Sequence, residues 1–142
     1  MKRSGSAVWS GGLKDGKGTL STESGTLEGV NYSFAKRFGD EKGTNPEELV
    51  GAAHAACYSM QLSGVLGQSS LTADEIRTTA VVTGVMNDGF TVTDVHLTVR
   101  AKIPGADEAA FMAAAQKAKE ICPISKLLNG SVDITLDAKL ES

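Results

Sequence analysis

The sequence has no surplus of basic residues, no long apolar run and only two cysteines. The first two shortages bear on which partners the protein can have. It contains 14 Lys and Arg against 17 Asp and Glu, for a net charge of −3. Because phosphate binding needs a surplus of positive charge, this balance argues against nucleic acid as a main partner. No apolar run approaches the roughly 18 to 20 residues that cross a bilayer. We therefore expect neither nucleic acid nor a membrane among the partners.

The N-terminal segment "MKRSGSAVWS" lacks the apolar stretch that follows the basic residues of a signal peptide. We therefore expect a cytoplasmic protein. A chain of 142 residues fits one domain and is long enough to bury a core. Repeats, low-complexity segments and linkers are absent, so residues 1–142 are predicted to form a single domain.

The chain has two cysteines, Cys57 and Cys122, which lie far apart in the sequence. Their spacing matches neither a CxxC redox motif nor a zinc knuckle, and a lasting structural disulfide is not expected in a reducing cytoplasm. Free cysteine is often simply buried, so two unrelated core thiols are one interpretation. A metal site that combines them with His54 and His96 finds no support in the spacing.

The first third of the sequence predicts strands followed by a long helix. The segments "SAVWSGGL" and "GKGTLSTES" are short strand patterns separated by a glycine-rich turn. The segment "NYSFAKRF" alternates and is also predicted as a strand, with Arg37 on its polar face. A helix is expected from about Pro46 to about Leu66, since Asn45 suits the N-cap and Pro46 the first helical position.

The remaining segments complete an α+β pattern. Two long strand patterns, "DEIRTTAVVTGVM" and "FTVTDVHLTVRAKI", flank the hairpin signal "NDG". The segments "GADEAAFMAAAQKAKEI" and "CPISKLLNG" predict helices, and "SVDITLDAKL" predicts a final strand. This order is typical of an α+β fold with a largely antiparallel sheet.

The two thiols have different local environments in these predicted elements. Cys122 is expected at the cap position of a helix, where unpaired amides stabilise a thiolate. Cys57 lies deep inside its helix, so its thiolate needs a cation from elsewhere. His54, about one turn earlier, is either a partner of this thiol or a core histidine bonded to the backbone. His96 is expected at the surface of its strand.

Two glutamates open the helix that carries Cys57. At about 100° per residue, Glu47 is turned about 80° from Cys57 around the axis, whereas Glu48 lies near the opposite face. Glu47 is therefore the better candidate to serve Cys57. The helix dipole, which favours carboxylates in the first turn, explains its presence equally well.

Three segments resemble one known family. The stretches "STESG", "FGDEKGTNPEELVGAAHAACYSM" and "KAKEICPISKLL" are similar to the OsmC branch of the OsmC/Ohr family of thiol-dependent peroxidases, over almost the whole chain. The resemblance implies that Cys57 attacks the peroxide and that Cys122 then forms a disulfide with it. It implies supporting roles for Arg37 and Glu47. It also implies an antiparallel sheet wrapped around a long central helix, in an intertwined homodimer.

The implied activity is reduction of organic hydroperoxides, and less readily of hydrogen peroxide, in oxidative and osmotic stress defence, with no metal, haem or flavin. A dithiol would regenerate the enzyme, with a lipoyl-type compound, thioredoxin and glutaredoxin as candidates. Two alternatives stay open: a redox switch without turnover, and a structural stress protein with inert thiols. The resemblance also leaves open whether Arg37 serves Cys57 of its own chain or of its partner.

Overall fold

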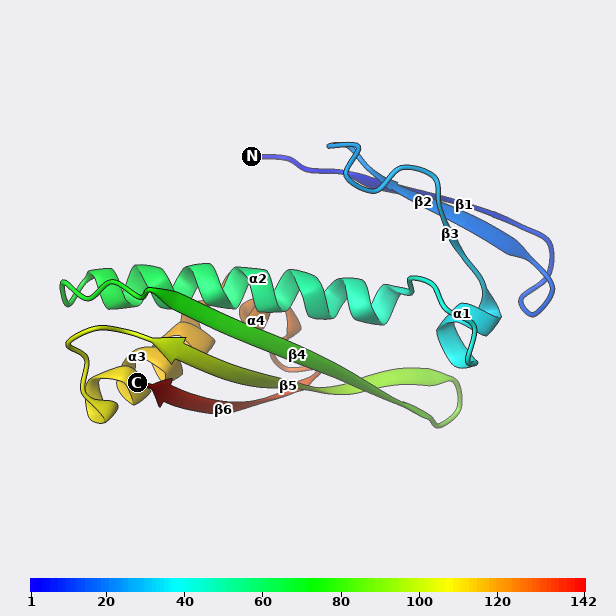
Figure 1. Cartoon of the computed structure of the whole chain (residues 1–142). Helices are drawn as coiled ribbons and strands as arrows, with labels where there is room; N and C mark the ends of the chain where they lie inside the picture. Colours follow the sequence, from blue (N-terminus) through cyan, green and yellow to red (C-terminus); the bar gives the residue numbers. More distant parts are fainter. The chain divides into compact units, whose positions relative to one another are not determined.

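The computed structural model describes all 142 residues and divides into two compact units, Met1–Leu49 and Val50–Ser142. Figure 1 labels the elements along the chain, and each unit is described by itself. In order they are β1 (Gly5–Ser10), β2 (Lys17–Thr22), β3 (Val30–Tyr32), α1 (Phe34–Phe38), α2 (Pro46–Gly67), β4 (Glu75–Met86), β5 (Phe90–Lys102), α3 (Glu108–Ile121), α4 (Pro123–Leu128) and β6 (Asp133–Glu141).

The first unit is built on a small antiparallel sheet with the order β1-β2-β3. All residues of the hydrophobic core cluster belong to the second unit. Apolar side chains of the first unit stay exposed, with 66% of Val8 and 71% of Leu13 accessible to solvent. Since a sheet of this size needs a covered apolar face to be stable, these side chains indicate that the first unit lacks a core of its own.

The segment predicted as a strand up to Phe38 is a strand only as far as Tyr32, and α1 follows. Ser33 is the N-cap of α1, and its hydroxyl accepts a hydrogen bond from the Lys36 amide at 3.2 Å. Phe34 and Phe38 then stack on one side of the helix, with ring centroids 4.9 Å apart. A spacing of four residues fits one face of a strand and one face of a helix equally well, which is why alternation misassigned this segment.

The second unit contains a mixed sheet with the order β4-β5-β6. Strands β4 and β5 form the expected antiparallel hairpin, and its turn places Gly89 at a φ of 112°. The expectation of an antiparallel sheet is wrong for β6, which runs parallel to β5 with Leu97 opposite Leu136. The helices α3 and α4 carry the chain back to the end of the sheet where β5 begins, as a parallel connection requires. An alternating pattern carries no information on strand direction.

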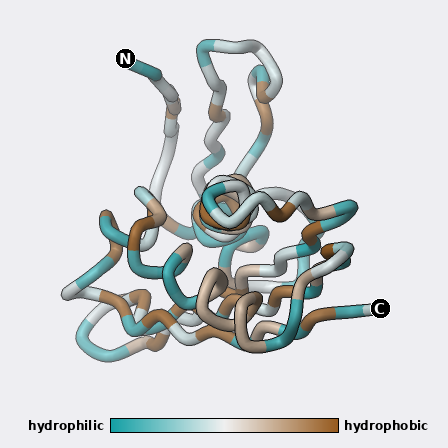
Figure 2. Tube along the Cα trace, turned by 90° about the vertical axis from the view of Figure 1, so that its left-hand side faces the viewer, coloured by the Kyte–Doolittle hydropathy of each residue, from teal (hydrophilic) through white to brown (hydrophobic).

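Alternate side chains of β5 point into the core, which α2 and α3 share with one face of the sheet. The Tyr58 hydroxyl of α2 donates to the Ala115 carbonyl of α3 at 3.0 Å, so the two helices are joined inside this core. Figure 2 looks roughly along α2 and shows the other elements of the second unit gathered on one side of it. The largest fully buried side chains are Tyr58, Phe111, Leu62, Leu66, Leu97, His54, Val95, Val99 and Cys122.

The helix α2 has one tightly packed side and one exposed side. A Cβ atom at Gly51 would lie 2.9 Å from the Ala80 carbonyl of β4, so the helix approaches this strand more closely than alanine allows. On the other side, Ala52, Ala56 and Met60 are exposed. No helix combines the length and apolar character needed to span a membrane.

Candidate active site

Cys57 lies in the middle of α2, as the sequence predicted. Asn45 caps this helix by accepting a hydrogen bond from the Glu48 amide at 2.8 Å, and Pro46 occupies the first turn. The Cys57 side chain is half-buried and packs against the core cluster of the second unit. Cys57 is therefore in contact with packed side chains without being fully buried.

Cys122 joins the two helices that follow the hairpin. Its amide donates to the Ala118 carbonyl at 2.9 Å and ends α3, while its carbonyl accepts from the Lys126 amide at 2.9 Å and begins α4. Pro123 supplies the first position of α4, and Cys122 itself is fully buried. The two helix ends thus hold the backbone of Cys122 from both sides.

The two thiols meet, and both are free rather than joined in a disulfide. Burial raises the pKa of the Cys57 thiol above its ordinary value, a hydrogen bond from the Ile124 amide opposes this, and the neighbouring Cys122 raises the pKa further. Burial and the second thiol thus favour the protonated form of Cys57. The free amides at the start of α4 were expected to stabilise the thiolate of Cys122. The Cys122 side chain makes no capping hydrogen bond there. The amide of Ile124 is bonded to Cys57 instead.

Arg37 and Glu47 form an ion pair in the first unit. Arg37 Nη2 lies 2.6 Å from Glu47 Oε1, and Arg37 Nε lies 3.1 Å from each carboxylate oxygen. The guanidinium carbon also sits 4.9 Å from the centroid of the Phe38 ring. The structure therefore brings together the arginine and the glutamate that the resemblance implied, with Glu47 rather than Glu48 in the contact.

A small aromatic pocket of about 250 Å³ adjoins Arg37 within the first unit. The rings of Trp9 and Tyr32 are 5.4 Å apart on its wall, and Phe34 and Phe38 complete it together with Leu13 and Ser33. The pocket combines an apolar lining with one cationic side chain.

His54 is a core histidine, as one interpretation expected. Its hydrogen-bond partner, however, is a side chain and not the backbone. Its Nε2 lies 2.8 Å from the hydroxyl of Ser125 on α4, and its Nδ1 is buried without a hydrogen-bond partner. Burial lowers the pKa of His54, which favours the neutral ring. Ser125 was not identified from the sequence. The available signal was its position one turn after Cys122, which corresponds to the position of His54 one turn before Cys57.

His96 lies on β5 between the buried positions of that strand, as expected for a surface residue. Its Nδ1 is 2.7 Å from the hydroxyl of Thr135 on β6, in an exposed contact. The structure contains no group of three or more His, Cys, Asp and Glu side chains that could hold a metal ion. The four residues considered for a metal site are therefore not gathered into one.

Comparison with known proteins identifies the family. The profile of the family described as OsmC-like protein matches residues 39–137. The chain is 49% identical over 143 residues to the peroxiredoxin OsmC of Escherichia coli, covering 100% of this chain and 99% of the relative. It is 32% identical over 124 residues to the organic hydroperoxide resistance protein OhrB of Bacillus subtilis, covering 86% of this chain and 89% of the relative.

The fold agrees with solved structures of similar proteins. The crystal structure of OhrB of Bacillus subtilis superimposes with a TM-score of 0.76 at 25% identity, over 96% of this chain and 98% of the other. An OsmC-like protein from Mycoplasma pneumoniae shares the fold, with a TM-score of 0.78 at 18% identity over 100% of this chain and 99% of the other. On these findings and the family profile, the chain belongs to the OsmC-like protein family.

Proposed function

We propose that this chain is a thiol-dependent peroxidase that reduces organic hydroperoxides, and hydrogen peroxide less readily. The observation that carries the proposal is the contact between two free thiols, half-buried Cys57 and fully buried Cys122. The names of the relatives, a peroxiredoxin and organic hydroperoxide resistance proteins, support the same chemistry. Half-buried Cys57 is the more accessible of the two cysteines and is proposed to meet the peroxide first, whereas Cys122 is fully buried.

The proposed reaction has two steps, after which the reduced enzyme is regenerated. The Cys57 thiolate attacks the distal peroxide oxygen, the O–O bond breaks, and the alkoxide leaves as an alcohol after taking a proton. Cys57 is then a sulfenic acid. The Cys122 sulfur attacks the Cys57 sulfur, an S–S bond forms, and the hydroxyl leaves as water. An external dithiol then reduces the disulfide and is itself oxidised.

Arg37 is proposed to supply the cation that the Cys57 thiolate needs. Burial and Cys122 both raise the pKa of Cys57, so a positive charge beside the sulfur is required to make the thiolate at neutral pH. A guanidinium offers five donors in a fixed plane, which lets it hold a carboxylate on one edge and a sulfur on another. In this proposal Glu47 orients Arg37, and Arg37 also stabilises charge on the leaving oxygen. The Cys57 that Arg37 acts on belongs either to the same chain as Arg37 or to a partner subunit.

The aromatic pocket beside Arg37 favours an organic peroxide over hydrogen peroxide. An alkyl or aryl group gains free energy when it leaves water for an apolar lining, whereas hydrogen peroxide has no such group. If Arg37 binds the peroxide oxygens, the alkyl group of the substrate is directed to the lining formed by Trp9, Tyr32, Phe34 and Phe38.

The working form is proposed to be an intertwined homodimer of a single-domain chain. Exposed apolar side chains support this: Val8 and Leu13 in the first unit, and Met60 with 76% exposure on the uncovered side of α2. A second copy that covers these surfaces would provide the apolar contact that they lack. The reductant, lipoyl-type or otherwise, and a cytoplasmic location stay predictions.

One experiment separates the peroxidase from the two alternatives. The reduced protein is treated with one equivalent of cumene hydroperoxide, and its intact mass and peptide map are recorded, followed by repeated cycles with a dithiol. A peroxidase loses two hydrogens, shows a Cys57–Cys122 cross-link and continues to consume peroxide with each cycle. A redox switch would react once without efficient turnover. An unchanged mass would overturn the proposal in favour of inert structural thiols.

A further inference from the structure

We propose that the buried hydrogen bond between His54 and Ser125 is a latch that holds α4 where Cys122 meets Cys57. In this inference His54 and Ser125 are positioning residues for disulfide formation, and neither touches the peroxide. Their role in turnover rests on the proposed peroxidase function, while their effect on the disulfide itself does not.

The latch repeats the geometry of the thiol pair one helical turn away. His54 precedes Cys57 on α2, and Ser125 follows Cys122 on α4, each by about one turn. His54 Nε2 and Ser125 Oγ are 2.8 Å apart, and the two residues are 0% and 4% exposed. The same two segments are thus joined by this hydrogen bond, by the meeting sulfurs and by the Ile124 amide bonded to Cys57.

The helix α4 is held by few contacts: Ile124 and Leu128 pack against the core, the Ile124 amide bonds Cys57, and Ser125 bonds His54. It is only 6 residues long, and Ser125 is the one buried residue within it. So short a helix is not stable on its own in water, so its placement depends on its contacts. A buried polar pair is a strong anchor, because breaking it leaves a desolvated imidazole nitrogen without a partner.

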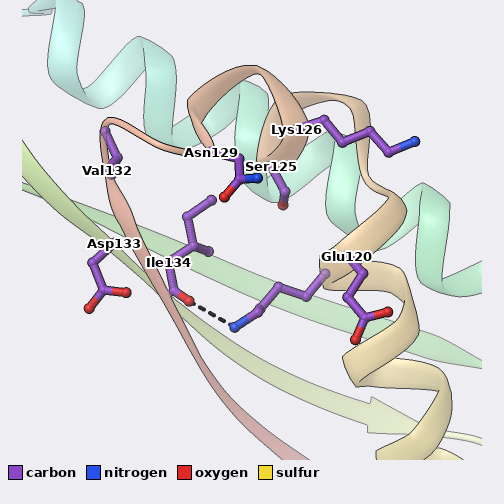
Figure 3. Close-up of a pocket in the computed structure, with 8 residues that line it drawn as sticks. Glu120, Ser125, Lys126, Asn129, Val132, Asp133 and Ile134 are labelled. Carbon is purple, nitrogen blue, oxygen red and sulfur yellow. Dashed lines mark hydrogen bonds between the residues drawn. The ribbon is translucent and has the colours of Figure 1, made fainter.

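A cavity of about 370 Å³ lies beside α4 (Figure 3). Ser125 and Asn129 of α4 face Val132 and Ile134 across it. The bond that spans this region, from Lys119 Nζ to the Ile134 carbonyl at 2.8 Å, ties α3 to β6 and does not hold α4. Ser125 lies at the edge of this cavity, and its hydrogen bond to His54 is the buried side-chain hydrogen bond that joins α4 to α2 there.

Disulfide formation is more sensitive to such placement than the first peroxide step. The S–S bond of about 2 Å forms only when the two Cβ atoms are about 3.5 to 4.5 Å apart. Cys57 sulfenic acid and the Cys122 thiol then give the disulfide and one water. Attack on the peroxide involves Cys57 of α2 without Cys122. Loosening α4 therefore lowers the stability of the disulfide and slows its formation more than it slows the first step, in which α4 takes part only through the Ile124 amide bonded to Cys57.

The test uses redox equilibrium, which needs no peroxide. The full-length wild-type protein, Ser125→Ala, Ser125→Thr and Ser59→Ala are equilibrated in buffers of reduced and oxidised dithiothreitol, and the Cys57–Cys122 disulfide is measured by mass. We expect Ser125→Ala to lower the equilibrium constant for the disulfide about tenfold, and Ser125→Thr to restore it. Ser59 is the matched control, because its hydroxyl also makes a hydrogen bond from one element to another, from α2 to Thr78 of β4 at 2.7 Å, but does not contact α4. An unchanged constant in Ser125→Ala overturns the latch.

Kinetics with cumene hydroperoxide then link the latch to turnover. In Ser125→Ala we expect loss of the Cys57 thiol at a rate within about twofold of wild type, about tenfold slower disulfide formation, and accumulation of Cys57 sulfinic acid. Equal slowing of both steps would overturn a positioning role. A wild-type protein that ignores the peroxide would refute the proposed function but leave the redox result standing. If Ser125→Ala does not fold, His54→Gln is measured in the same buffers, and a wild-type constant there overturns the latch.

Discussion

Arg37 holds both carboxylate oxygens of Glu47, with its Nη2 2.6 Å from Oε1 and its Nε 3.1 Å from each oxygen. A contact with two donors fixes the plane of the guanidinium as well as its position. The pair lies at the surface of the first unit, with 37% of the Arg37 side chain and 15% of the Glu47 side chain exposed. A surface pair contributes little to stability, so its value is in orientation.

Replacing Glu47 by Gln is therefore expected to affect catalysis more than folding. The amide loses the charge and keeps only one of the two acceptor oxygens that Arg37 contacts. Because misplacement of a catalytic group by about 1 Å costs about 100-fold, we expect kcat/KM with cumene hydroperoxide to fall about 10- to 100-fold. The matched control is Glu48→Gln, which alters the exposed neighbour in the same helical turn and is expected to leave kcat/KM within about twofold. Equal losses in both variants would contradict an orienting role.

The two cysteine variants have different expected outcomes. Cys57→Ser removes the sulfur that attacks the peroxide and is expected to abolish turnover. Cys122→Ser retains that sulfur but has no resolving thiol, so one turnover is expected, followed by oxidation of Cys57 to sulfinic acid. Peroxide consumption and intact mass measure both. Steady cycling by Cys122→Ser at the wild-type rate would show that Cys122 does not resolve the sulfenic acid.

Arg37→Gln is expected to shift the pH dependence of Cys57 alkylation upward. Burial and Cys122 raise the pKa of Cys57 above the ordinary 9.0, so without the cation the thiolate forms only at higher pH. The proposed role of Arg37 predicts that the wild-type midpoint lies below that of Arg37→Gln. The measurement is the rate of iodoacetamide labelling of Cys57 against pH, with Arg100→Gln as the control for general loss of a positive charge. Coincident profiles for wild type and Arg37→Gln would refute the role of Arg37.

Buried His54 makes the free energy of unfolding depend on pH. Burial lowers its pKa below the ordinary 6.5 in the folded state, so at pH values just below 6.5 the unfolded chain binds a proton that the folded chain does not. Stability is full above pH 6.5 and is lost as the pH falls toward the folded pKa, by at most about 1.4 kcal/mol per pH unit. Urea titrations between pH 7.5 and 5.5 measure this slope. His54→Gln should show a smaller slope, since His96 and the carboxylates are common to both proteins.

The close approach of α2 to β4 is testable at Gly51. A Cβ there would lie 2.9 Å from the Ala80 carbonyl, and because the obstacle is backbone, Gly51→Ala is expected to cost about 1 to 3 kcal/mol of unfolding free energy. Gly64 on the same helix is the matched control, since a Cβ there would meet nothing within 4 Å. Gly64→Ala is expected to stabilise by up to about 1 kcal/mol through helix propensity. Thermal and urea unfolding distinguish the two, and a stabilising Gly51→Ala would contradict the close contact.

Most secondary structure was predictable because its signals are local. Asn45 and Pro46 begin α2, Asp107 begins α3 by accepting from the Ala110 amide at 2.7 Å, and the hairpin turn lies where "NDG" placed it. The error at α1 arose because Phe34 and Phe38 satisfy strand and helix periods alike. The parallel direction of β6 was missed because alternation is unchanged when a strand is reversed.

By itself, the sequence determined most of the elements, the family resemblance and the residues most suited to thiol chemistry, because caps, turns and motif spacing act between near neighbours in the chain. Only the tertiary structure decided which distant residues meet. Packing of α4 against α2 brought Cys122 to Cys57 and Ser125 to His54, and it turned the Ile124 amide to Cys57 rather than leaving Cys122 as the capped thiol. These contacts join segments from opposite halves of the chain. They follow from the burial of one shared core, which local patterns in the sequence do not describe.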